Sequence, residues 1–584
     1  MFEQVYAPLG NIYLSALFAA IPIIVLLVML GVLRTAAHWA ALAGLVSAVL
    51  VALVFYGMPF GLTASAALYG AAFGLFPIIW IVINALFLHN LTVETGVFDV
   101  VRESLASLTT DRRIQALIIA FAFGALLEGI AGFGAPVAIT AAIMASLGFN
   151  PLYAASIALL ANTAPVAFGS LGVPVITLGG LVAPIVGNEN VGFVTDQLSA
   201  MVGRQLPIFS LIVPGFMIYV MAGWRGTMQV MPAVLTAGIS FAITQFLVSN
   251  FIGPALVDVL AALVCLGAMV LLLRVWQPRT AWRFEDEPEA GSDEAAAGEA
   301  PQAHESRTGT SGERSGSAAG ISTLQAFVPY IILVVVVVIS RIGDLFPNLP
   351  AALNVTNLLN LATFEIPWPG LNEQVIRIAP IVSEPTPYPA IYVLNILSTA
   401  GTVVLFASII AGFAMGAGLG TQLRVYGQTL NQLKLAILTV AMILAVAFVM
   451  NYSGATSTLG LAFAGTGLLF PFFSAFIGWL GVFLSGSDTS ANALFGPMQT
   501  VTAQNLGVEP ALAGATNSSG GVMGKMISPQ NLTVGASAIG QVGREADIFR
   551  MTIRWSLMLT TAMGILAMIQ AYVIPWIIPP LTGG

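Results

Sequence analysis

The chain has 584 residues, of which 58% are hydrophobic and only 8% are charged, and its mean hydropathy is +0.94. Soluble domains carry about 25% charged residues, so this composition excludes an ordinary soluble protein and predicts an all-α polytopic membrane protein. One cysteine excludes an intramolecular disulfide framework, and three scattered histidines do not suggest a metal cluster. The net charge of −7 comes partly from an acidic stretch near mid-chain. We therefore expect membrane lipid as a partner, and no cofactor, metal or nucleic acid.

Three apolar segments open the chain, and each is close to the length of about 20 residues that spans a bilayer. They are residues 14–33, 38–56 and 67–88. Lys and Arg are absent from residues 1–13 and 57–63 but occur between spans on the other side. Because cytoplasmic loops are enriched in Lys and Arg, this pattern predicts an outside N-terminus. Residues 89–113 are then inside, and their charge pattern is typical of an interfacial amphipathic helix.

Residues 114–148 are predicted to form a re-entrant helical hairpin, because a carboxylate and a broken backbone interrupt the apolar run. Glu128 is followed closely by Gly129, Gly132 and Gly134. In lipid, an acidic side chain and an interrupted helix are both unfavourable unless they serve a purpose. We expect two half-helices to meet near these glycines.

The next apolar segment, residues 151–186, is too long for one unbroken span and contains Asn162 and Thr163 before a proline. It is predicted to be a crossing helix that unwinds halfway. Residues 205–222 form the next span and end near basic residues. These elements make residues 1–226 the first structural repeat.

Two connecting spans, residues 228–248 and 254–273 within 227–274, lead to residues 275–324. This segment loses the apolar pattern and is rich in Glu, Ser, Gly and Ala around residues 284–320. Such a composition buries too little apolar surface to fold, so we expect a disordered cytoplasmic linker.

Residues 325–584 repeat the first half with the opposite orientation. The predicted elements are three spans near 325–341, 390–418 and 432–452, a hairpin at about 471–506, a broken span at 510–538 and a span at 551–579. The sequence echo between Leu147–Pro151 and Leu506–Pro510 supports this correspondence. The prediction is an inverted repeat of about twelve crossings plus two hairpins, with both termini outside.

Six stretches resemble, in order, those of the bacterial lactate permease family. They are LLEGIAGFGAPVAITAA, ANTAPVAFGSLGVP, MVGRQLP, NYSG, FLSGSDTSANALF and GKMISPQ. The resemblance runs nearly end to end and lacks only residues 284–320. It implies proton-coupled uptake of L-lactate, and often D-lactate and glycolate, across the cytoplasmic membrane. The plan is also similar to the ion transporter superfamily, which implies an elevator-type movement of a hairpin-bearing transport domain against a scaffold. Ser485 and Ala491 depart from the Thr and Ser expected there.

A small 2-hydroxy acid is an anion, so a site at mid-membrane needs N–H groups at half-helix N-termini, polar side chains and close backbone approach at glycines. The candidate substrate-binding residues are Gly129, Gly132, Gly134, Asn162, Thr163, Ser487, Thr489, Asn517, Ser518, Ser519 and Lys525. Any single Asn, Ser or Thr among them could instead join helices. Arg204 fits an interfacial anchor or a functional residue, and Asp258 is expected to face an aqueous edge.

Glu128 and Asp488 are the two hairpin-tip carboxylates and the candidate proton-coupling residues. If Lys525 pairs with Asp488, it keeps that carboxylate charged; Lys525 could instead extend to the membrane interface. Glu128 has no cation nearby in sequence, and burial disfavours a charged carboxylate. Glu128 is therefore the predicted proton carrier.

Three alternative functions fit the sequence less well. A membrane-embedded enzyme would need a base for Ser485 or Ser487, and no histidine lies in these segments to complete a triad with Asp488. A channel has a continuous pore, whereas broken helices in inverted repeats favour a transporter that works by alternating access. A sodium-coupled carboxylate carrier of the same architecture is the main alternative. The sequence leaves the oligomeric state open, with a homodimer as one option.

Overall fold

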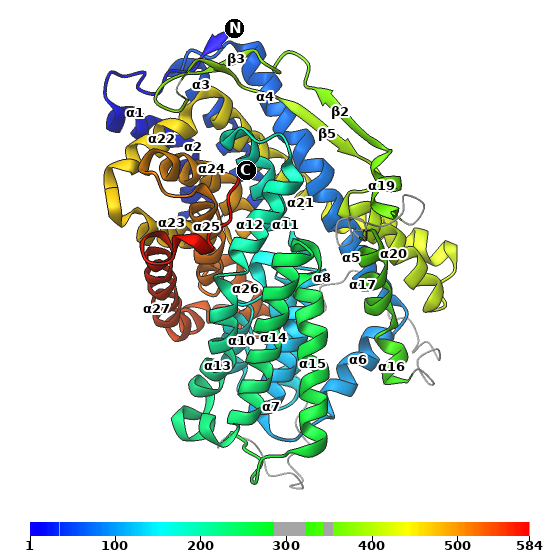
Figure 1. Cartoon of the computed structure of the whole chain (residues 1–584). Helices are drawn as coiled ribbons and strands as arrows, with labels where there is room; N and C mark the ends of the chain where they lie inside the picture. The colour runs from blue at the N-terminus through cyan, green and yellow to red at the C-terminus, as the bar shows by residue number, and fades with distance from the viewer. Residues whose placement is uncertain are drawn as a thin grey trace.

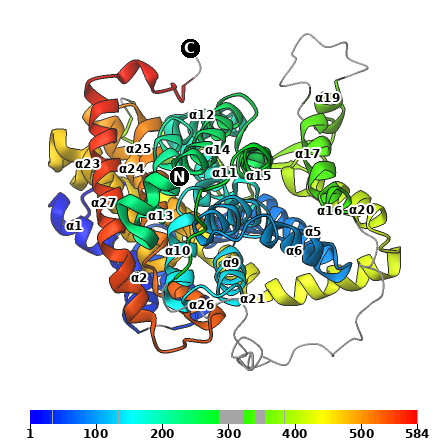
Figure 2. The same ribbon diagram turned by 90° about the horizontal axis from the view of Figure 1, so that it is seen from below.

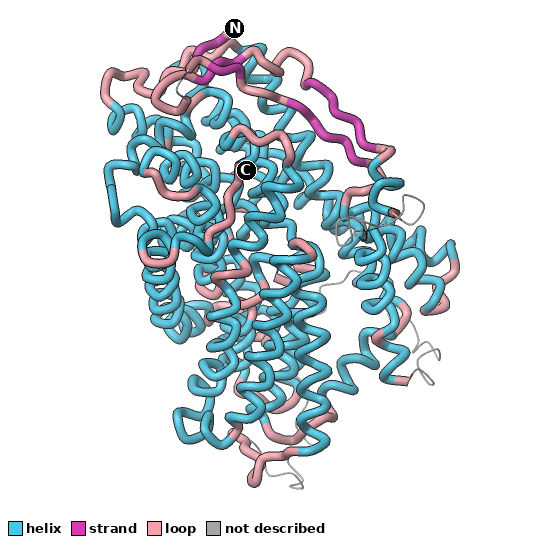
Figure 3. Tube along the Cα trace, in the orientation of Figure 1, coloured by secondary structure: helices cyan, strands magenta, loops and turns pink. Residues whose placement is uncertain are grey.

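The computed structural model describes residues 1–33, 35–132, 134–284, 322–340, 342, 354–382 and 384–582 (Figure 1). Most of the predicted linker, residues 285–321, lies outside the described residues, as does the stretch 343–353 of the predicted outer loop. Within the described chain the structure is helical, with short strands at the end that holds the N-terminus (Figure 3).

The first part of the chain, up to the linker, contains only helices after its N-terminal strand. They are α1 (Ile12–Ala19), α2 (Ile21–Leu27), η1 (Val28–Val32), α3 (Ala37–Val54), α4 (Phe60–Phe73), η2 (Gly74–Ile79), α5 (Trp80–Glu94), α6 (Val97–Ala106), α7 (Arg112–Ala116), η3 (Leu117–Phe123), α8 (Gly124–Ile130), α9 (Ala135–Ser146), α10 (Pro151–Ala161), η4 (Val166–Phe168), α11 (Gly169–Val186), α12 (Val191–Val202), α13 (Leu206–Gln229), α14 (Met231–Phe251), η5 (Pro254–Leu256) and α15 (Val257–Val275).

The second part contains the remaining helices. They are α16 (Thr323–Ala326), α17 (Val328–Ser340), α19 (Val355–Asn360), α20 (Ala400–Ala414), α21 (Leu419–Ser453), α22 (Ala455–Phe463), η8 (Ala464–Leu469), α23 (Phe470–Ser485), α24 (Asp488–Leu506), α25 (Pro510–Lys525), α26 (Pro529–Ala538), α27 (Glu545–Tyr572) and η9 (Pro575–Ile577). Seen from below, α23 and α27 lie on one side of the molecule and α16, α17 and α20 on the other (Figure 2).

Two small sheets show that the all-α prediction is wrong for the segment before α20. In one sheet β3 (Val375–Arg377) lies between β1 (Phe2–Glu3), which is parallel to it, and β4 (Thr386–Pro387), which is antiparallel. In the other, β2 (Thr363–Pro367) pairs antiparallel with β5 (Ile391–Asn395). The span predicted at 390–418 is helical only over α20 (Ala400–Ala414), because residues 391–395 form strand β5 instead.

Ten helices of the described chain are long and apolar enough to cross a membrane, or eleven if α1 and the helix after it, bent by 41°, form one span. This establishes a multi-pass helical membrane protein. The third predicted span, 67–88, belongs to a longer run from Phe60 to Glu94. That run contains a non-helical residue at Phe76, next to Pro77, whose ring and missing N–H disturb helical hydrogen bonding.

Both segments predicted as hairpins contain two helices that pack against each other. In the first, η3 and α8 pack on α9, and the connection contains Gly132 and Gly134 with φ of +53° and +86°. In the second, α23 packs on α24, and the connection contains Gly486 with φ of +72°. Glycine adopts this left-handed conformation without the steric penalty of a side chain.

Both segments predicted as broken spans contain breaks. In the first, α10 ends at Ala161, and Ser170, Leu171 and Gly172 have positive φ values. In the second, α25 ends at Lys525 and α26 starts at Pro529, after Ser528 caps it. Proline at the first helical position is compatible with a helix start because its missing N–H would be unpaired there anyway.

Contacts place the segments predicted outside at one end of the molecule. Strand β1 pairs with β3. Arg377 of β3 donates to the carbonyl of Pro184 over 2.9 Å, and Asn188 donates to the carbonyl of Leu581 over 2.8 Å. The segments near both termini therefore lie at the same end, in agreement with an even number of crossings.

Contacts likewise join the loops predicted inside. Arg113 donates to the carbonyl of Gly226 over 3.0 Å and to the side chain of Gln229 over 2.7 Å. The backbone N–H of Trp282 donates to Asp111 over 3.1 Å. Three loops that carry most of the basic residues of the first part thus meet at one end, as the charge pattern predicts.

Single-cysteine labelling tests the orientation, after the buried Cys265 is replaced by alanine. Glu189 and Val542 are exposed, and they lie in loops predicted outside and inside. We expect Glu189→Cys to react with a membrane-impermeant maleimide in intact cells. Val542→Cys should react only after permeabilisation. Labelling of Val542→Cys in intact cells would contradict the proposed orientation.

Candidate functional site

A buried ion pair joins the two halves of the chain at the centre of the candidate site. Lys525, the last residue of α25, donates from Nζ to Oε1 of Glu128 in α8 over 2.7 Å. Asn162, just after α10, donates from Nδ2 to the other oxygen, Oε2, over 2.9 Å. Glu128 is 2% exposed and Lys525 6% exposed. Both oxygens of Glu128 therefore have donors, and the two opposite charges neutralise each other.

This pair overturns the sequence-based assignment of Lys525. From the sequence, Asp488 is the candidate partner of Lys525, and Glu128 is left without a cation. The structure instead pairs Lys525 with Glu128, 397 residues away. The reason is the packing of the two halves, which places the end of α25 beside α8 and cannot be read from local sequence.

Asp488 has a different environment at the start of α24. Its Oδ2 accepts a hydrogen bond from the Ser518 hydroxyl over 2.6 Å and one from Asn492 Nδ2 over 3.3 Å. Its Oδ1 has no hydrogen-bond partner among the described residues. A Cβ at Gly521 would lie 2.6 Å from this oxygen, so the carboxylate rests directly against the α25 backbone. Asp488 thus retains a free acceptor.

Asn517 belongs to a polar network inside the second half. It donates to Asn492 Oδ1 over 2.8 Å and accepts from Gln499 Nε2 over 2.6 Å. Gln499 also contacts Ser474 of α23. All four side chains are buried. Because Asn517 uses its oxygen and its amino group within the protein, its main role here is to join α23, α24 and α25.

The connections predicted as hairpin tips meet at the start of α26. Asn531 donates to the carbonyls of Gly486 and Lys525 over 3.4 and 3.3 Å. A Cβ at Gly134 would lie 3.5 Å from Asn531 Oδ1. The two predicted tips and the break after α25 therefore meet at one asparagine.

The other residues predicted to bind substrate differ in burial and in hydrogen bonding. Thr163 and Ser519 are buried, with hydroxyl oxygens that have no hydrogen-bond partner among the described residues. Ser487 caps α24 by accepting from the Ser490 N–H, and Thr489 is half-buried. Gly132 packs against the Ser170 hydroxyl. Unpaired buried hydroxyls are unfavourable, so Thr163 and Ser519 are suited to bind a ligand.

Sequence reasoning missed two residues of this region, Asn492 and Asn531, and misplaced a third, Asp258. Asn492 also donates to the carbonyl of Pro174 over 3.1 Å, which ties α24 to the break in α11. Asn492 lies within the stretch FLSGSDTSANALF and Asn531 directly follows GKMISPQ, so these two side-chain amides were the available signal. Asp258 was expected at an aqueous edge, but it is 1% exposed.

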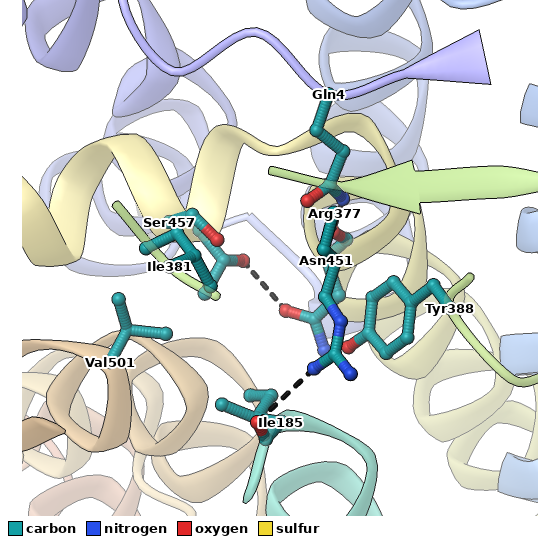
Figure 4. A pocket seen from close by; sticks show the side chains of 9 residues that line it. Gln4, Ile185, Arg377, Ile381, Tyr388, Asn451, Ser457 and Val501 are labelled. Atoms are coloured by element: carbon teal, nitrogen blue, oxygen red, sulfur yellow. Dashed lines mark hydrogen bonds between the residues drawn. The ribbon is translucent and has the colours of Figure 1, made fainter. Parts of the chain in front are cut away.

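A small cavity lies beside β1 and β3, at the end of the molecule that holds the N-terminus (Figure 4). Its volume is about 10 Å³, and Gln4, Arg377, Tyr388, Asn451 and Thr456 are among its lining residues. This volume holds roughly one water molecule and is too small for a hydroxy acid.

Arg377 lies at the C-terminal end of the broken helix α11. Its guanidinium donates to the carbonyls of Pro184 and Ile185 in the last turn of α11 and stacks 4.7 Å from the Tyr388 ring centre (Figure 4). A cation at a helix C-terminus is favoured by the helix dipole. The segment that carries β3 is thus held against the end of α11.

The geometry makes Lys525 the group that an incoming anion would contact. It is the only Lys or Arg of either described hairpin or broken-span segment, and its present partner is a carboxylate. Another carboxylate can replace Glu128 as that partner without leaving the ammonium unpaired. The arrangement is therefore compatible with a bound anion taking the place of the Glu128 carboxylate at Lys525.

Stability measurements test the ion pair. Breaking a buried pair from one side costs about 3–5 kcal/mol, because the other charge stays buried and uncompensated. We expect Lys525→Met to lower the thermal unfolding midpoint in detergent. The double variant Lys525→Met/Glu128→Gln should recover most of the loss. Lys434→Met, at an exposed lysine, is the control and should be neutral. A single Lys525→Met variant as stable as the parent would contradict the pairing.

Known proteins similar to this chain are membrane permeases. A family model described as L-lactate permease matches residues 15–574. Glycolate permease GlcA of Escherichia coli K12 is 45% identical over 98% of both chains. The L-lactate permeases of Escherichia coli K12 and Bacillus subtilis 168 are each 43% identical, over 99% of this chain and 100% of their own.

Among solved structures, MtrF of Neisseria gonorrhoeae aligns over 89% of this chain and 86% of its own, with a TM-score of 0.45 and 11% identity, a likeness too weak to support an argument. The family match covers nearly all of the chain, including both hairpin segments and both broken spans. The chain therefore belongs to the L-lactate permease family, whose members are membrane transporters and not enzymes.

Proposed function

We propose that this protein takes up lactate and glycolate, each together with a proton, across the cytoplasmic membrane. The names of its relatives support the two substrates. The observation that carries the proposal is the buried ion pair between Lys525 and Glu128. It provides a cation for a carboxylate substrate and a carboxylate that can accept a proton.

The substrate carboxylate and Glu128 compete for Lys525, and this competition couples substrate binding to proton binding. When the substrate carboxylate pairs with Lys525, Glu128 loses its cation and keeps only the Asn162 amide. A buried carboxylate without a counter-charge is unfavourable, so Glu128 takes up a proton. Binding of the anion and of the proton then favour each other, and this reciprocal coupling allows a proton gradient to drive uptake.

The same exchange keeps the site neutral. In the empty site Lys525 and Glu128 cancel, and in the loaded site Lys525 and the substrate anion cancel while Glu128 is protonated. Moving a net charge through the hydrocarbon region is unfavourable. Both the empty and the loaded carrier can therefore change conformation without an uncompensated charge at this site.

Asp488 lies close enough to take part in binding. Its free Oδ1 faces Gly521, which is one helical turn before Lys525 on the same face of α25. This oxygen can accept the hydroxyl hydrogen of a 2-hydroxy acid whose carboxylate is bound at Lys525. It can also accept a proton, which makes Asp488 a second candidate for coupling. Thr163 and Ser519 supply further hydroxyls.

We further propose alternating access by an elevator movement, in which two re-entrant hairpins and two broken spans move together. The meeting of both hairpin tips at Asn531 supports such a unit. The inverted repeat, about twelve crossings and two outside termini belong to the same proposal.

Uptake into sealed vesicles tests coupling. Labelled lactate and glycolate should accumulate under an imposed proton gradient and not under a sodium gradient alone, because the proposed counter-ligand is the Glu128 carboxyl. Accumulation driven only by sodium would replace this proposal with a sodium-coupled carrier. Glu128→Gln should lose proton-driven accumulation by at least about tenfold while retaining lactate exchange, since it cannot take up the proton.

Glu94→Gln is the matched control, because Glu94 also forms an ion pair, with Arg424, but at an exposed position. It should accumulate substrate like the parent. If Asp488→Asn loses accumulation and Glu128→Gln does not, the coupling proton belongs to Asp488 and our assignment of Glu128 is wrong.

A further inference from the structure

Asp258, in the first turn of α15, is a buried carboxyl that the proposed mechanism does not use. It is 1% exposed, and neither of its oxygens has a hydrogen-bond partner among the described residues. Buried polar groups are normally hydrogen-bonded. A buried acid without hydrogen-bond partners does not stabilise the fold, so we look for a functional reason for its presence.

Asp258 lies against the segment that carries Glu128. A Cβ added to Gly129 would lie 2.9 Å from the Cβ of Asp258 and 3.1 Å from the backbone nitrogen of Val259. The absence of a side chain at Gly129 thus lets α8 and α15 touch at the residue next to Glu128. The two carboxyl-bearing segments are in direct contact.

Few other charges face Asp258. Helix α8 contributes Glu128, and Lys525 of α25 also acts on Asp258 electrostatically. The other elements that pack on α15 include α14, η3, α11 and η5, which have no ionisable side chain, and α17, whose only one is Tyr330. Lys525 is already paired with Glu128.

These surroundings favour the neutral acid in this conformation. An ionised Asp258 would have no hydrogen-bond donor among the described residues and would lie in a low-dielectric interior. Both conditions oppose ionisation, and the Glu128–Lys525 pair beside it carries no net charge to offset them. The situation changes when Lys525 turns to a substrate anion, because Glu128 then requires a proton.

We propose that Asp258 is a second proton-binding site, which holds a proton while Lys525 neutralises Glu128 and passes it to Glu128 when substrate binds. In this step the Oδ–H bond of Asp258 breaks and an Oε–H bond forms on Glu128. The bonding electron pair stays on Asp258, which is reprotonated from the side with the higher proton concentration. The inference rests on the proposed proton coupling and adds the residue that supplies the proton.

Transport by Asp258→Asn tests this role. Asparagine keeps the size of the neutral acid but cannot release a proton. We expect lactate exchange within about twofold of the parent and proton-driven accumulation reduced at least about tenfold. Asp99→Asn, at an exposed position paired with Arg102, is the control and should behave like the parent. Parental accumulation by Asp258→Asn, or equal loss of exchange and accumulation in a folded variant, would overturn the proposal.

Infrared spectroscopy tests the same site without relying on the variant's folding. Parent protein at neutral pH should show the C=O stretch of a protonated carboxyl, which carbon-13 labelling of aspartate shifts. This band should persist in Asp488→Asn and change on addition of lactate. A lack of any protonated aspartate band in Asp488→Asn would refute the assignment. If instead the parent shows no proton-driven accumulation, the proposed coupling itself fails, and that result is separate from the infrared one.

Discussion

The ion pair between Lys525 and Glu128 connects the two halves of the chain inside a membrane protein, where an unpaired charge is especially unfavourable. Each partner depends on the other, because removal of one leaves a buried charge. Asn162 completes the set of donors on Glu128 from the first broken span. The pair therefore joins α8, α10 and α25, and in the proposed mechanism a substrate anion enters by taking the place of Glu128 at Lys525.

Glycines beside each buried acid make this arrangement sterically possible. A Cβ at Gly169 would lie 2.7 Å from Glu128 Oε1, one at Gly521 2.6 Å from Asp488 Oδ1, and one at Gly129 2.9 Å from the Cβ of Asp258. These distances are too short for real side chains. The glycines of the hairpin and broken-span segments thus bring backbone and carboxyl groups into contact, which explains their placement better than flexibility does.

Much of the fold could be predicted from the sequence, because helix breaks and loop charges are set by residues close together in the chain. Glycine, proline and a lone acid within apolar runs indicated the breaks near Glu128 and Asp488, and basic residues indicated which loops share an end. The partner of Lys525 could not be predicted, because pairing over 397 residues depends on how the halves pack. Asp258 was misjudged for a related reason. Its place near the start of a span suggested water, whereas the packing of α8 against α15 buries it.

Proton uptake on substrate binding tests the central claim most directly, because it follows the exchange of partners at Lys525 without requiring transport. Calorimetric titration of purified protein with lactate, in buffers of different ionisation enthalpy, gives the number of protons taken up per lactate bound. Lactate binding should take up close to one proton in the parent and none in Glu128→Gln. Lactate binding by the parent with no net proton uptake would contradict the exchange of Glu128 for substrate at Lys525.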